Sequence, residues 1–262
     1  MGGDCFYMSR FFVDPGAVRP DTGTITITGE DVKHIRNVLR NVPGDALMLS
    51  DCSGTDYHVT IEQMEKDSIL TRIVYSEANK TEPPVKVTLF QGIPKADKMD
   101  HIIQKCVELG VHRIVPVITA RTVVRFEKER DAAAKTTRWQ RIALEAAKQC
   151  DRGSIPMVEE PVRFNQALKL AESCLLRLFP YEEETTGNLR QYFMDGQKTG
   201  TVDNIALFIG PEGGFAPEET AKAAECGFMS VTLGPRILRT ETAGMAVLAV
   251  IMYELGDMNC RL

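Results

Sequence analysis

Two adjacent prolines, Pro83 and Pro84, divide this chain of 262 residues into two parts with different hydrophobic periods. Before them, apolar and polar residues alternate with a period of two, which is typical of strands that have one solvent-facing side. After them, continuous apolar segments of strand length alternate with segments of helical period, which is typical of a parallel sheet covered by helices on both faces. The break therefore predicts two domains, a small β-barrel at residues 1–80 and an α/β domain at residues 81–262.

The same patterns place the individual elements. In the first part they predict a helix at residues 31–40 and strands at residues 24–28, 46–49, 57–61 and 69–75. In the second part they predict strands at residues 85–90, 113–118, 175–179, 205–209 and 231–233, and helices at residues 97–109, 137–150, 164–173 and 241–255. No apolar run approaches the roughly 18 residues that a membrane-spanning helix needs, so we expect no membrane association.

The composition is that of a globular protein, with 44% hydrophobic and 26% charged residues, which argues against disorder, collagen and coiled coil. The N-terminus lacks the basic start and apolar core of a secretory signal. The seven cysteines are scattered without a C-x-x-C pair, which favours reduced thiols and a cytoplasmic location. The four histidines are dispersed as well, so we expect no metal. P-loop, dinucleotide-binding, zinc-protease and serine-hydrolase motifs are absent.

Charge is distributed unevenly along the chain. The net charge is −5, but residues 95–152 carry 13 basic and 8 acidic side chains. Binding to a polyanion depends on such local patches rather than on the total charge. An ordinary solvated surface explains the same surplus, so both interpretations stay open at this point.

The first candidate site follows the predicted strand at residues 205–209, where the chain reads Gly-Pro-Glu-Gly-Gly at residues 210–214. In open α/β sheets, ligands bind beyond the carboxyl ends of the strands. Gly213 and Gly214 permit positive φ and let a ligand approach the backbone closely. A tight connection between a strand and a helix explains these glycines equally well.

The second candidate site follows the strand at residues 231–233 and contains an apolar pair, Ile237 and Leu238, in what should be a surface loop. Such a pair favours a lining for a flat hydrophobic ligand such as a nucleobase. The next two residues, Thr240 and Glu241, are also explained as an N-cap and a favourable charge at the start of the last helix. That explanation does not account for the apolar pair.

Basic side chains gather on two predicted helices. Lys33, Arg36 and Arg40 share one face of the helix at residues 31–40, opposite Val32, Ile35 and Leu39. In the helix at residues 137–150, the single tryptophan, Trp139, stands between Arg138 and Gln140-Arg141. These faces suit contacts with phosphates or stacking on an unpaired base, while a solvated helix and a core tryptophan are the simpler alternatives.

Together these motifs resemble the SPOUT class of S-adenosylmethionine-dependent RNA methyltransferases. They are most similar to the RsmE family, the bacterial 16S ribosomal RNA uridine-N3 methyltransferases. The two loops carry most of the likeness, and further matching segments lie at residues 10–13, 34–40, 95–100, 108–110, 138–139, 145–149 and 152. The resemblance extends over residues 9–255.

The resemblance implies a C-terminal SPOUT domain with a deep trefoil knot, an N-terminal PUA-like RNA-binding barrel and a homodimer. It implies S-adenosylmethionine as cofactor, S-adenosylhomocysteine as product, and the uridine conventionally numbered 1498 in 16S ribosomal RNA of the small subunit as substrate. The implied cofactor residues are Pro180, Tyr181, Gly210, Pro211, Glu212, Gly213, Gly214, Leu233, Gly234, Ile237, Leu238, Arg239 and Thr242. The candidate RNA-binding residues are Arg10, Lys33, Arg36, Arg40 and Arg138.

Methylation of uracil N3 requires loss of its proton, and negative charge then spreads onto O2 and O4. We predict that Arg239 stabilises this charge and that Glu212 or Glu241 assists deprotonation. Alternatively, Glu212 only shapes its loop, and Glu241 only caps the start of the last helix.

Three other functions stay open on the sequence. The chain could be a non-catalytic RNA-binding or ribosome-assembly protein, although intact cofactor loops argue against this. It could be an enzyme of nucleotide or phosphate metabolism with residues 210–214 as an anion loop, although no P-loop lysine is present. It could also be a SPOUT methyltransferase that acts on another RNA or another atom, since the loops report on the cofactor more than on the base.

Overall fold

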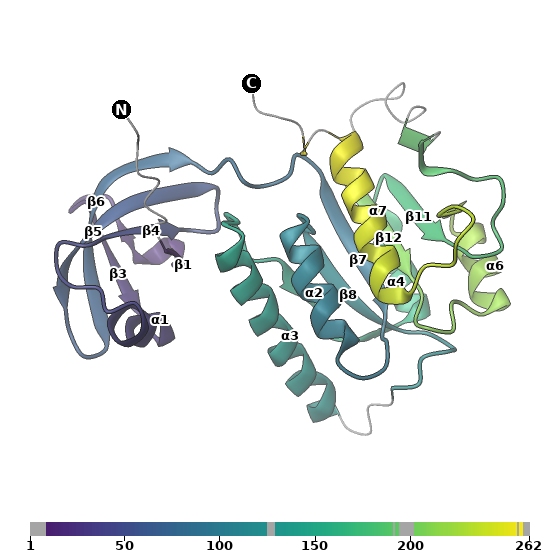
Figure 1. The fold of residues 1–262 in the computed structure, drawn as a ribbon, viewed down its shortest axis with the longest axis horizontal. Coiled ribbons are helices and arrows are strands. Elements are labelled where there is room, and N and C mark those ends of the chain that lie inside the picture. Colours follow the sequence, from purple (N-terminus) through teal and green to yellow (C-terminus); the bar gives the residue numbers. More distant parts are fainter. Residues whose placement is uncertain (1–8, 125–128, 191, 194–201, 256, 259–262) are drawn as a thin grey trace. The chain divides into compact units, whose positions relative to one another are not determined.

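The computed structural model describes residues 9–124, 129–190, 192–193, 202–255 and 257–258. The chain forms two compact units, shown as a ribbon in Figure 1. The first comprises Met1–Glu82 together with Ala147–Ile155, and the second comprises Pro83–Ala146 and Pro156–Leu262. The main break thus falls at the two prolines, but a short segment from the middle of the chain joins the first unit, which the sequence pattern did not indicate.

The first unit is built on a curled, mixed sheet. Its strands are β1 (Arg10–Phe12), β2 (Val18–Arg19), β3 (Thr24–Thr28), β4 (Ala46–Ser50), β5 (Thr55–Met64) and β6 (Ser68–Ala78), in the order β1-β4-β5-β6-β3-β2. Strand β1 pairs parallel with β4, and the other pairs are antiparallel. Because β1 and β2 lie at opposite edges of this order, the sheet that we predicted as a small β-barrel is a curled half-barrel.

The helix predicted at residues 31–40 consists of an α-helical turn followed by a π-helical segment. A short α1 (Glu30–Lys33) continues as a π-helical segment, His34–Val38. Val32 and Ile35 are buried in the core of the sheet, whereas Leu39 is 38% exposed. The wider π turn changes the angular spacing of side chains, so the expected apolar face ends before Leu39.

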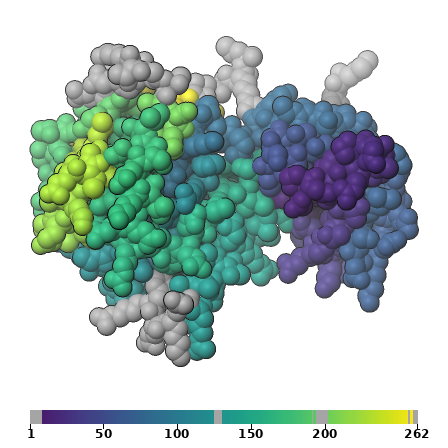
Figure 2. Space-filling view, turned by 180° about the vertical axis from the view of Figure 1, so that it is seen from behind, coloured from purple at the N-terminus to yellow at the C-terminus, as the bar shows by residue number. Residues whose placement is uncertain are grey.

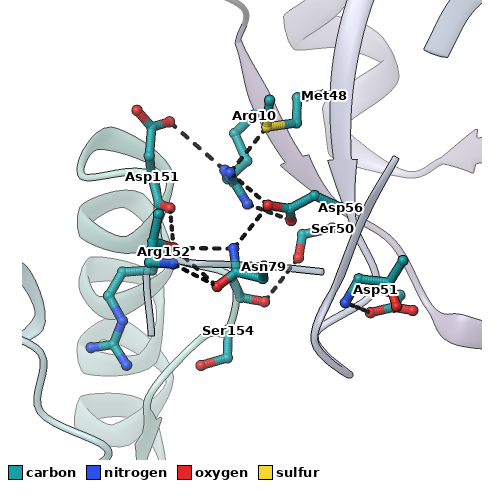
Figure 3. A network of polar contacts seen from close by, with 12 residues as sticks. Arg10, Met48, Ser50, Asp51, Asp56, Asn79, Asp151, Arg152 and Ser154 are labelled. Carbon is teal, nitrogen blue, oxygen red and sulfur yellow. Dashed lines mark hydrogen bonds and ion pairs between the residues drawn. The ribbon is translucent and has the colours of Figure 1, made fainter. Parts of the chain in front are cut away.

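A polar network ties the segment Ala147–Ile155 to this sheet (Figure 3). Arg10 on β1 donates to both carboxylate oxygens of Asp56 on β5, at 2.7 and 3.1 Å, and lies 3.7 Å from Asp151. Asn79 donates to the same Asp56 at 2.8 Å. The side chain of Arg10 is only 4% exposed, so its charge is neutralised inside the unit.

Glu82 closes the other side of this network. Its carboxylate accepts hydrogen bonds from Arg152 at 3.0 and 2.6 Å, from the N–H groups of Gly153 and Ser154 at 2.9 and 3.1 Å, and from the Ser154 hydroxyl at 2.9 Å. Burial raises the pKa of Glu82, but the hydrogen bonds and the charge of Arg152 outweigh it, so the pKa lies below its usual range. The carboxylate is therefore ionised at neutral pH and fixes the turn after helix α3 (Glu129–Gln149).

The second unit contains a parallel sheet in the order β10-β8-β7-β12-β11-β13, with β9 paired to β8. Its strands are β7 (Lys86–Gly92), β8 (Arg113–Ile118), β9 (Met157–Val158), β10 (Val162–Arg163), β11 (Leu176–Pro180), β12 (Asn204–Ile209) and β13 (Met229–Val231). Its helices are α2 (Lys98–Glu108), α3 (Glu129–Gln149), α4 (Phe164–Leu170), α6 (Pro217–Glu225) and α7 (Thr240–Glu254). None of the helices in the described ranges is both long and apolar enough to cross a membrane.

The side chains of the central strands alternate between two apolar layers. On one face, Phe90 and Phe208 stack with ring centroids 4.4 Å apart, in a cluster that includes residues of α4 and α6. Figure 2, seen from behind, shows green and yellow-green atoms of the segment from α4 to α6 on this side of the unit. On the other face, Leu89 lies toward α7, which packs beside α2. The sheet is thus covered on both faces, as its continuous apolar strands predict.

Helix α3 differs from the sequence-based assignment in its first turns. Helix α3 begins at Glu129, whereas the predicted helix begins at residue 137. Trp139 on this helix is 3% exposed, so it belongs to the core and does not offer a stacking surface for a base.

Candidate functional site

The carboxyl ends of β12, β11 and β13, which are neighbours in the sheet, surround a cavity of about 850 Å³. This position is the one where open α/β sheets bind ligands. Three loops supply most of its wall, at residues 180–185, 209–215 and 232–241. The wall includes Pro180, Tyr181, Gly210, Pro211, Glu212, Gly213, Gly214, Leu233, Gly234, Ile237, Leu238, Arg239 and Glu241. Of the residues proposed from the sequence for cofactor binding, Thr242 alone is not part of the wall.

The loop at residues 210–214 makes a tight turn. The N–H of Gly214 donates to the Pro211 carbonyl at 2.9 Å, and Gly214 has a φ of +67°. A Cβ on Gly210 would lie 3.0 Å from the backbone of Gly214, so this turn also requires glycine at its start. Gly213 does not have a positive φ, which corrects our expectation for that residue.

The loop at residues 210–214 is also held closely against strand β7. A Cβ on Gly92, the last residue of β7, would lie 2.5 Å from Cδ and 2.6 Å from the nitrogen of Pro211. Gly92 is buried. The absence of a side chain here therefore lets the loop lie directly on the end of β7.

Thr240 connects the same loop to helix α7. Its hydroxyl donates to the Gly210 carbonyl at 2.5 Å and accepts from the Gln91 amide at 2.9 Å. The N-cap of α7 is Arg239, with extended backbone and no side-chain capping bond. The interpretation of Thr240 as the N-cap is therefore wrong, because its side chain joins the loop at residues 210–214 to strand β7.

The apolar pair differs in exposure. Leu238 is half-buried, whereas Ile237 is 89% exposed although it lines the cavity. Gly234 reaches a φ of +94° at the start of this loop. The two side chains are thus placed at the mouth of the cavity, as a lining that a flat ligand could cover.

Lys98, at the start of α2, places its ammonium group between two carboxylates of the cavity. Its Nζ lies 3.1 Å from Oε1 of Glu212 and 3.3 Å from Oε2 of Glu241. The hydrogen bond to Glu212 raises the pKa of Lys98, desolvation lowers it, and Glu241 raises it further, so that the pKa lies above its usual value. Lys98 therefore carries its positive charge at neutral pH.

Glu212 is engaged through both of its carboxylate oxygens. The N–H of Lys95 donates to them at 3.1 and 3.3 Å, in addition to the contact with Lys98. Partial burial raises the pKa of Glu212, but hydrogen bonds from backbone N–H groups and from Lys98 outweigh it, so the pKa lies below its usual range. Of its two possible roles, these contacts favour the shaping of the loop over proton transfer.

A second acidic group lies on the loop after β11. Glu184 accepts hydrogen bonds from the N–H groups of Thr186 and Gly187, at 2.8 and 3.1 Å, and from the Thr186 hydroxyl at 2.8 Å. These bonds lower the pKa of Glu184 to about 2. With Glu182 it gives this side of the cavity a negative charge.

Arg239 projects from the last residue before α7 and is exposed. Within the described ranges its side chain has no hydrogen-bond or ion-pair partner, so its charge is available to a ligand. Sequence reasoning missed Lys98, Glu182 and Glu184, which also line the cavity. The one local signal for Lys98 is its place shortly after the carboxyl end of β7, at the same edge of the sheet as the two loops.

The candidate RNA-binding residues differ in their exposure and in their ion pairs. Lys33 and Arg40 are exposed and Arg36 is half-buried, all on or next to the short helical segment of the first unit. Arg138 is exposed but is paired with Asp97 and Asp100. Arg10 is buried in its pair with Asp56, which removes the basis for the predicted phosphate contact at Arg10.

Known protein families match both units. The RNA methyltransferase domain family matches residues 81–252, and the RNA methyltransferase PUA domain family matches residues 27–74. A protein of Bacillus subtilis named ribosomal RNA small subunit methyltransferase E is 33% identical over 249 residues, which cover 94% of this chain and 97% of that protein.

Solved structures with similar sequences have the same fold. A ribosomal RNA small subunit methyltransferase E of Neisseria gonorrhoeae, bound to S-adenosyl methionine, superimposes with a TM-score of 0.82 at 32% identity over 97% of this chain and all of that chain. A methyltransferase structure from Legionella pneumophila, also with this cofactor, gives a TM-score of 0.82 at 32% identity over 94% of this chain and 97% of that chain.

Proposed function

The chain belongs to the family of ribosomal RNA small subunit methyltransferases E, and we propose that it transfers a methyl group from S-adenosylmethionine to 16S ribosomal RNA. We further propose N3 of a uridine, the one conventionally numbered 1498, as the acceptor atom. The observation that carries this proposal is the cavity at the carboxyl ends of β11, β12 and β13, whose wall combines apolar side chains, glycine-rich backbone and opposite charges.

The residues of the cavity fit S-adenosylmethionine. Its volume of about 850 Å³ lies within the range of about 300–1,000 Å³ typical of small-molecule sites. Leu238 and Ile237 offer apolar surface for an adenine ring, and the backbone groups at residues 210–214 and 233–234 offer hydrogen bonds. The carboxylates of Glu182 and Glu184 offer negative charge to a cationic ligand. We therefore propose the set of cofactor-binding residues inferred from the sequence, without Thr242 and with these two acidic residues added.

The bound cofactor would supply a methyl group on a positively charged sulfur, and the protein supplies position and electrostatics. In the proposed reaction, Arg239 holds a positive charge next to O2 or O4 of the uracil while the N3 proton leaves. Glu241 accepts that proton directly or through water. Lys98 contacts both carboxylates, but only Glu212 also accepts the Lys95 N–H with its two oxygens, so Glu241 is the less engaged of the two.

We propose that the first unit binds RNA and that the second carries out the transfer, with the domain boundary near residue 80. Lys33, Arg36 and Arg40 are the proposed phosphate contacts of the first unit, and Arg138 is a further one. We also propose that the parallel sheet contains a deep trefoil knot. Support comes from β12, which lies between the earlier strands β7 and β11, and from α7, which returns to pack on β7 and α2.

We propose a homodimer in the cytoplasm, where ribosomal RNA is modified. Helix α7 supports the dimer, because it is largely apolar and leaves Val250 and Tyr253 40% and 63% exposed. A second copy of the chain could cover these side chains. Light scattering should give about twice the chain mass of 29.1 kDa, and a mass of one chain would contradict this part of the proposal.

Cofactor binding and methyl transfer test the proposal together. Calorimetry of the full chain should show S-adenosylmethionine binding, and radioactive methyl should pass to small ribosomal subunits or to protein-free 16S RNA. Binding without transfer to either substrate would favour the non-catalytic RNA-binding alternative. Transfer to another RNA would favour a methyltransferase of different specificity, and no binding at all would refute the proposal.

A further inference from the structure

Lys98 is the one cation of the cavity wall that is paired with two carboxylates in the described ranges. It stands on α2, Glu212 stands on the loop after β12, and Glu241 stands on the first turn of α7. The three elements are separate in sequence, and these three side chains meet at this edge of the sheet. A single ammonium group thus joins Glu241, the proposed proton acceptor, to Glu212, which shapes its loop.

The surroundings leave Lys98 as the main source of positive charge between these carboxylates. Lys95 contributes only its backbone N–H, to Glu212. The side chain of Arg138, on α3, is directed to Asp97 and Asp100, at and after the start of α2. Arg121, on the loop after β8, donates from its guanidinium to the Gly213 carbonyl at 2.6 Å, next to Glu212. The other titratable or charged groups of the cavity wall are Tyr181, Glu182 and Glu184 on the loop after β11, and Arg236 and Arg239 on the loop before α7. His101 follows Lys98 by one turn of α2.

We propose that Lys98 is a positioning residue of the methyl-transfer site, which acts through Glu212 and Glu241. Its charge lets two carboxylates face the same cavity side by side, and its contacts hold the loop at residues 210–214 against the start of α7. The role of Lys98 in methyl transfer rests on the proposed function. Its electrostatic part is a property of the free protein and can be measured without cofactor or RNA.

The physical consequence concerns proton affinity. An opposite charge within about 4–6 Å lowers the pKa of a carboxyl group by about 1–3 units. In Lys98→Met the ammonium is absent while the burial of Glu212 remains, so the pKa of Glu212 rises. A proton then binds to Glu212 at a higher pH, and a reaction that needs Glu212 ionised, as the loop at residues 210–214 has it here, loses rate on the acid side.

A matched set of variants isolates this effect. Lys98→Met removes the charge, and Lys98→Arg keeps it. Lys105→Met makes the same change on the same helix, at a lysine paired with Glu108 at 2.7 Å and outside the cavity wall. Thermal unfolding of each variant shows whether it is folded, and Lys98→Arg provides a charged variant at the same position.

The first measurement is a carbon-13 NMR titration of glutamate carboxyl groups in the free protein, with Glu212 assigned through Glu212→Gln. We expect the pKa of Glu212 to rise by about one unit or more in Lys98→Met, and to stay within about half a unit of wild type in Lys98→Arg and Lys105→Met. An unchanged pKa of Glu212 in Lys98→Met would overturn the proposal, whether or not the protein is a methyltransferase.

The second measurement is the pH dependence of methyl transfer under saturating cofactor and RNA. We expect the acid limb of kcat to move upward by about one unit in Lys98→Met and to return toward wild type in Lys98→Arg. A Lys98→Met enzyme with the wild-type profile would overturn the positioning role. A wild-type protein that transfers no methyl group would instead overturn the proposed function, while the NMR titration still decides the electrostatic role of Lys98.

Discussion

The close approach of Gly92 to Pro211 gives a sharp test of how the cofactor loop is held. In Gly92→Ala, the new methyl group would lie 2.5 Å from Cδ and 2.6 Å from the nitrogen of Pro211. Carbon atoms in contact prefer a separation of about 3.5–4.0 Å, so Pro211 must move by about 1 Å. Both clashing atoms belong to a proline ring, which has no rotamer that avoids the contact, and the whole loop must shift.

We expect three effects of this shift. Overpacking of a buried site costs about 1–3 kcal/mol of unfolding free energy. A displacement of about 1 Å in a reacting geometry costs about a hundredfold in rate, so methyl transfer to 16S RNA should fall by about that factor. Calorimetry with S-adenosylmethionine should show weaker binding as well.

Gly244→Ala is the control, because a methyl group on this buried glycine of α7 would make ordinary contacts at 3.6–3.8 Å. It should keep binding and rate, and it should gain up to about 1 kcal/mol of stability, since alanine favours a helix interior. A Gly92→Ala protein with wild-type binding and rate would refute our account of how the loop is held.

Three further predictions concern charge and packing. The pKa of Glu82 is lowered in the folded protein, so the ionised carboxylate stabilises the fold above its unfolded pKa of about 4.3, and this stabilisation is lost as pH falls through the folded pKa. Glu82→Gln should therefore lower the unfolding free energy by about 2–4 kcal/mol at pH 7 and speed hydrogen exchange in β4 and β5, and its difference from wild type should vanish in acid. Equal exchange rates at pH 7 would contradict this prediction. Arg36→Ala and Arg40→Ala should each reduce the salt dependence of RNA binding by about one unit of slope, whereas Arg10→Met should leave the slope unchanged and lower stability by about 3–5 kcal/mol; the reverse pattern would reject these assignments. Leu238→Ala should weaken S-adenosylmethionine binding by about 1–3 kcal/mol through lost apolar contact, as measured by calorimetry, and an unchanged affinity would remove Leu238 from the lining.

Elements that are fixed by local pattern were predictable. The strands at residues 24–28 and 113–118 have the predicted bounds, because period-two alternation and burial on both faces each leave a clear signal. The first turns of α3 were missed, because residues 129–136 are polar or alanine and carry no apolar stripe. The half-barrel was predicted as a barrel, because no single segment of sequence indicates whether the edge strands β1 and β2 pair with each other.

The loops of the site were predictable as ligand loops because glycine and apolar residues are unusual after buried strands. Their connections were not predictable in the same way. Arg10 pairs with Asp56, 46 residues away in sequence, and Lys98 pairs with two acidic residues on distant loops. Ion pairs between remote elements leave no periodic pattern in the sequence. For this reason Arg10 was predicted to contact phosphate, and Lys98 was not predicted as a residue of the cavity.

Mass spectrometry of nucleosides from 16S ribosomal RNA tests the central claim most directly. RNA from cells that lack this gene should be incubated with the protein and S-adenosylmethionine, and then digested to nucleosides. We predict that 3-methyluridine appears at one residue per RNA molecule and is absent before treatment. RNA that stays unmodified, or that gains its methyl group on another base or on a ribose oxygen, would contradict the account.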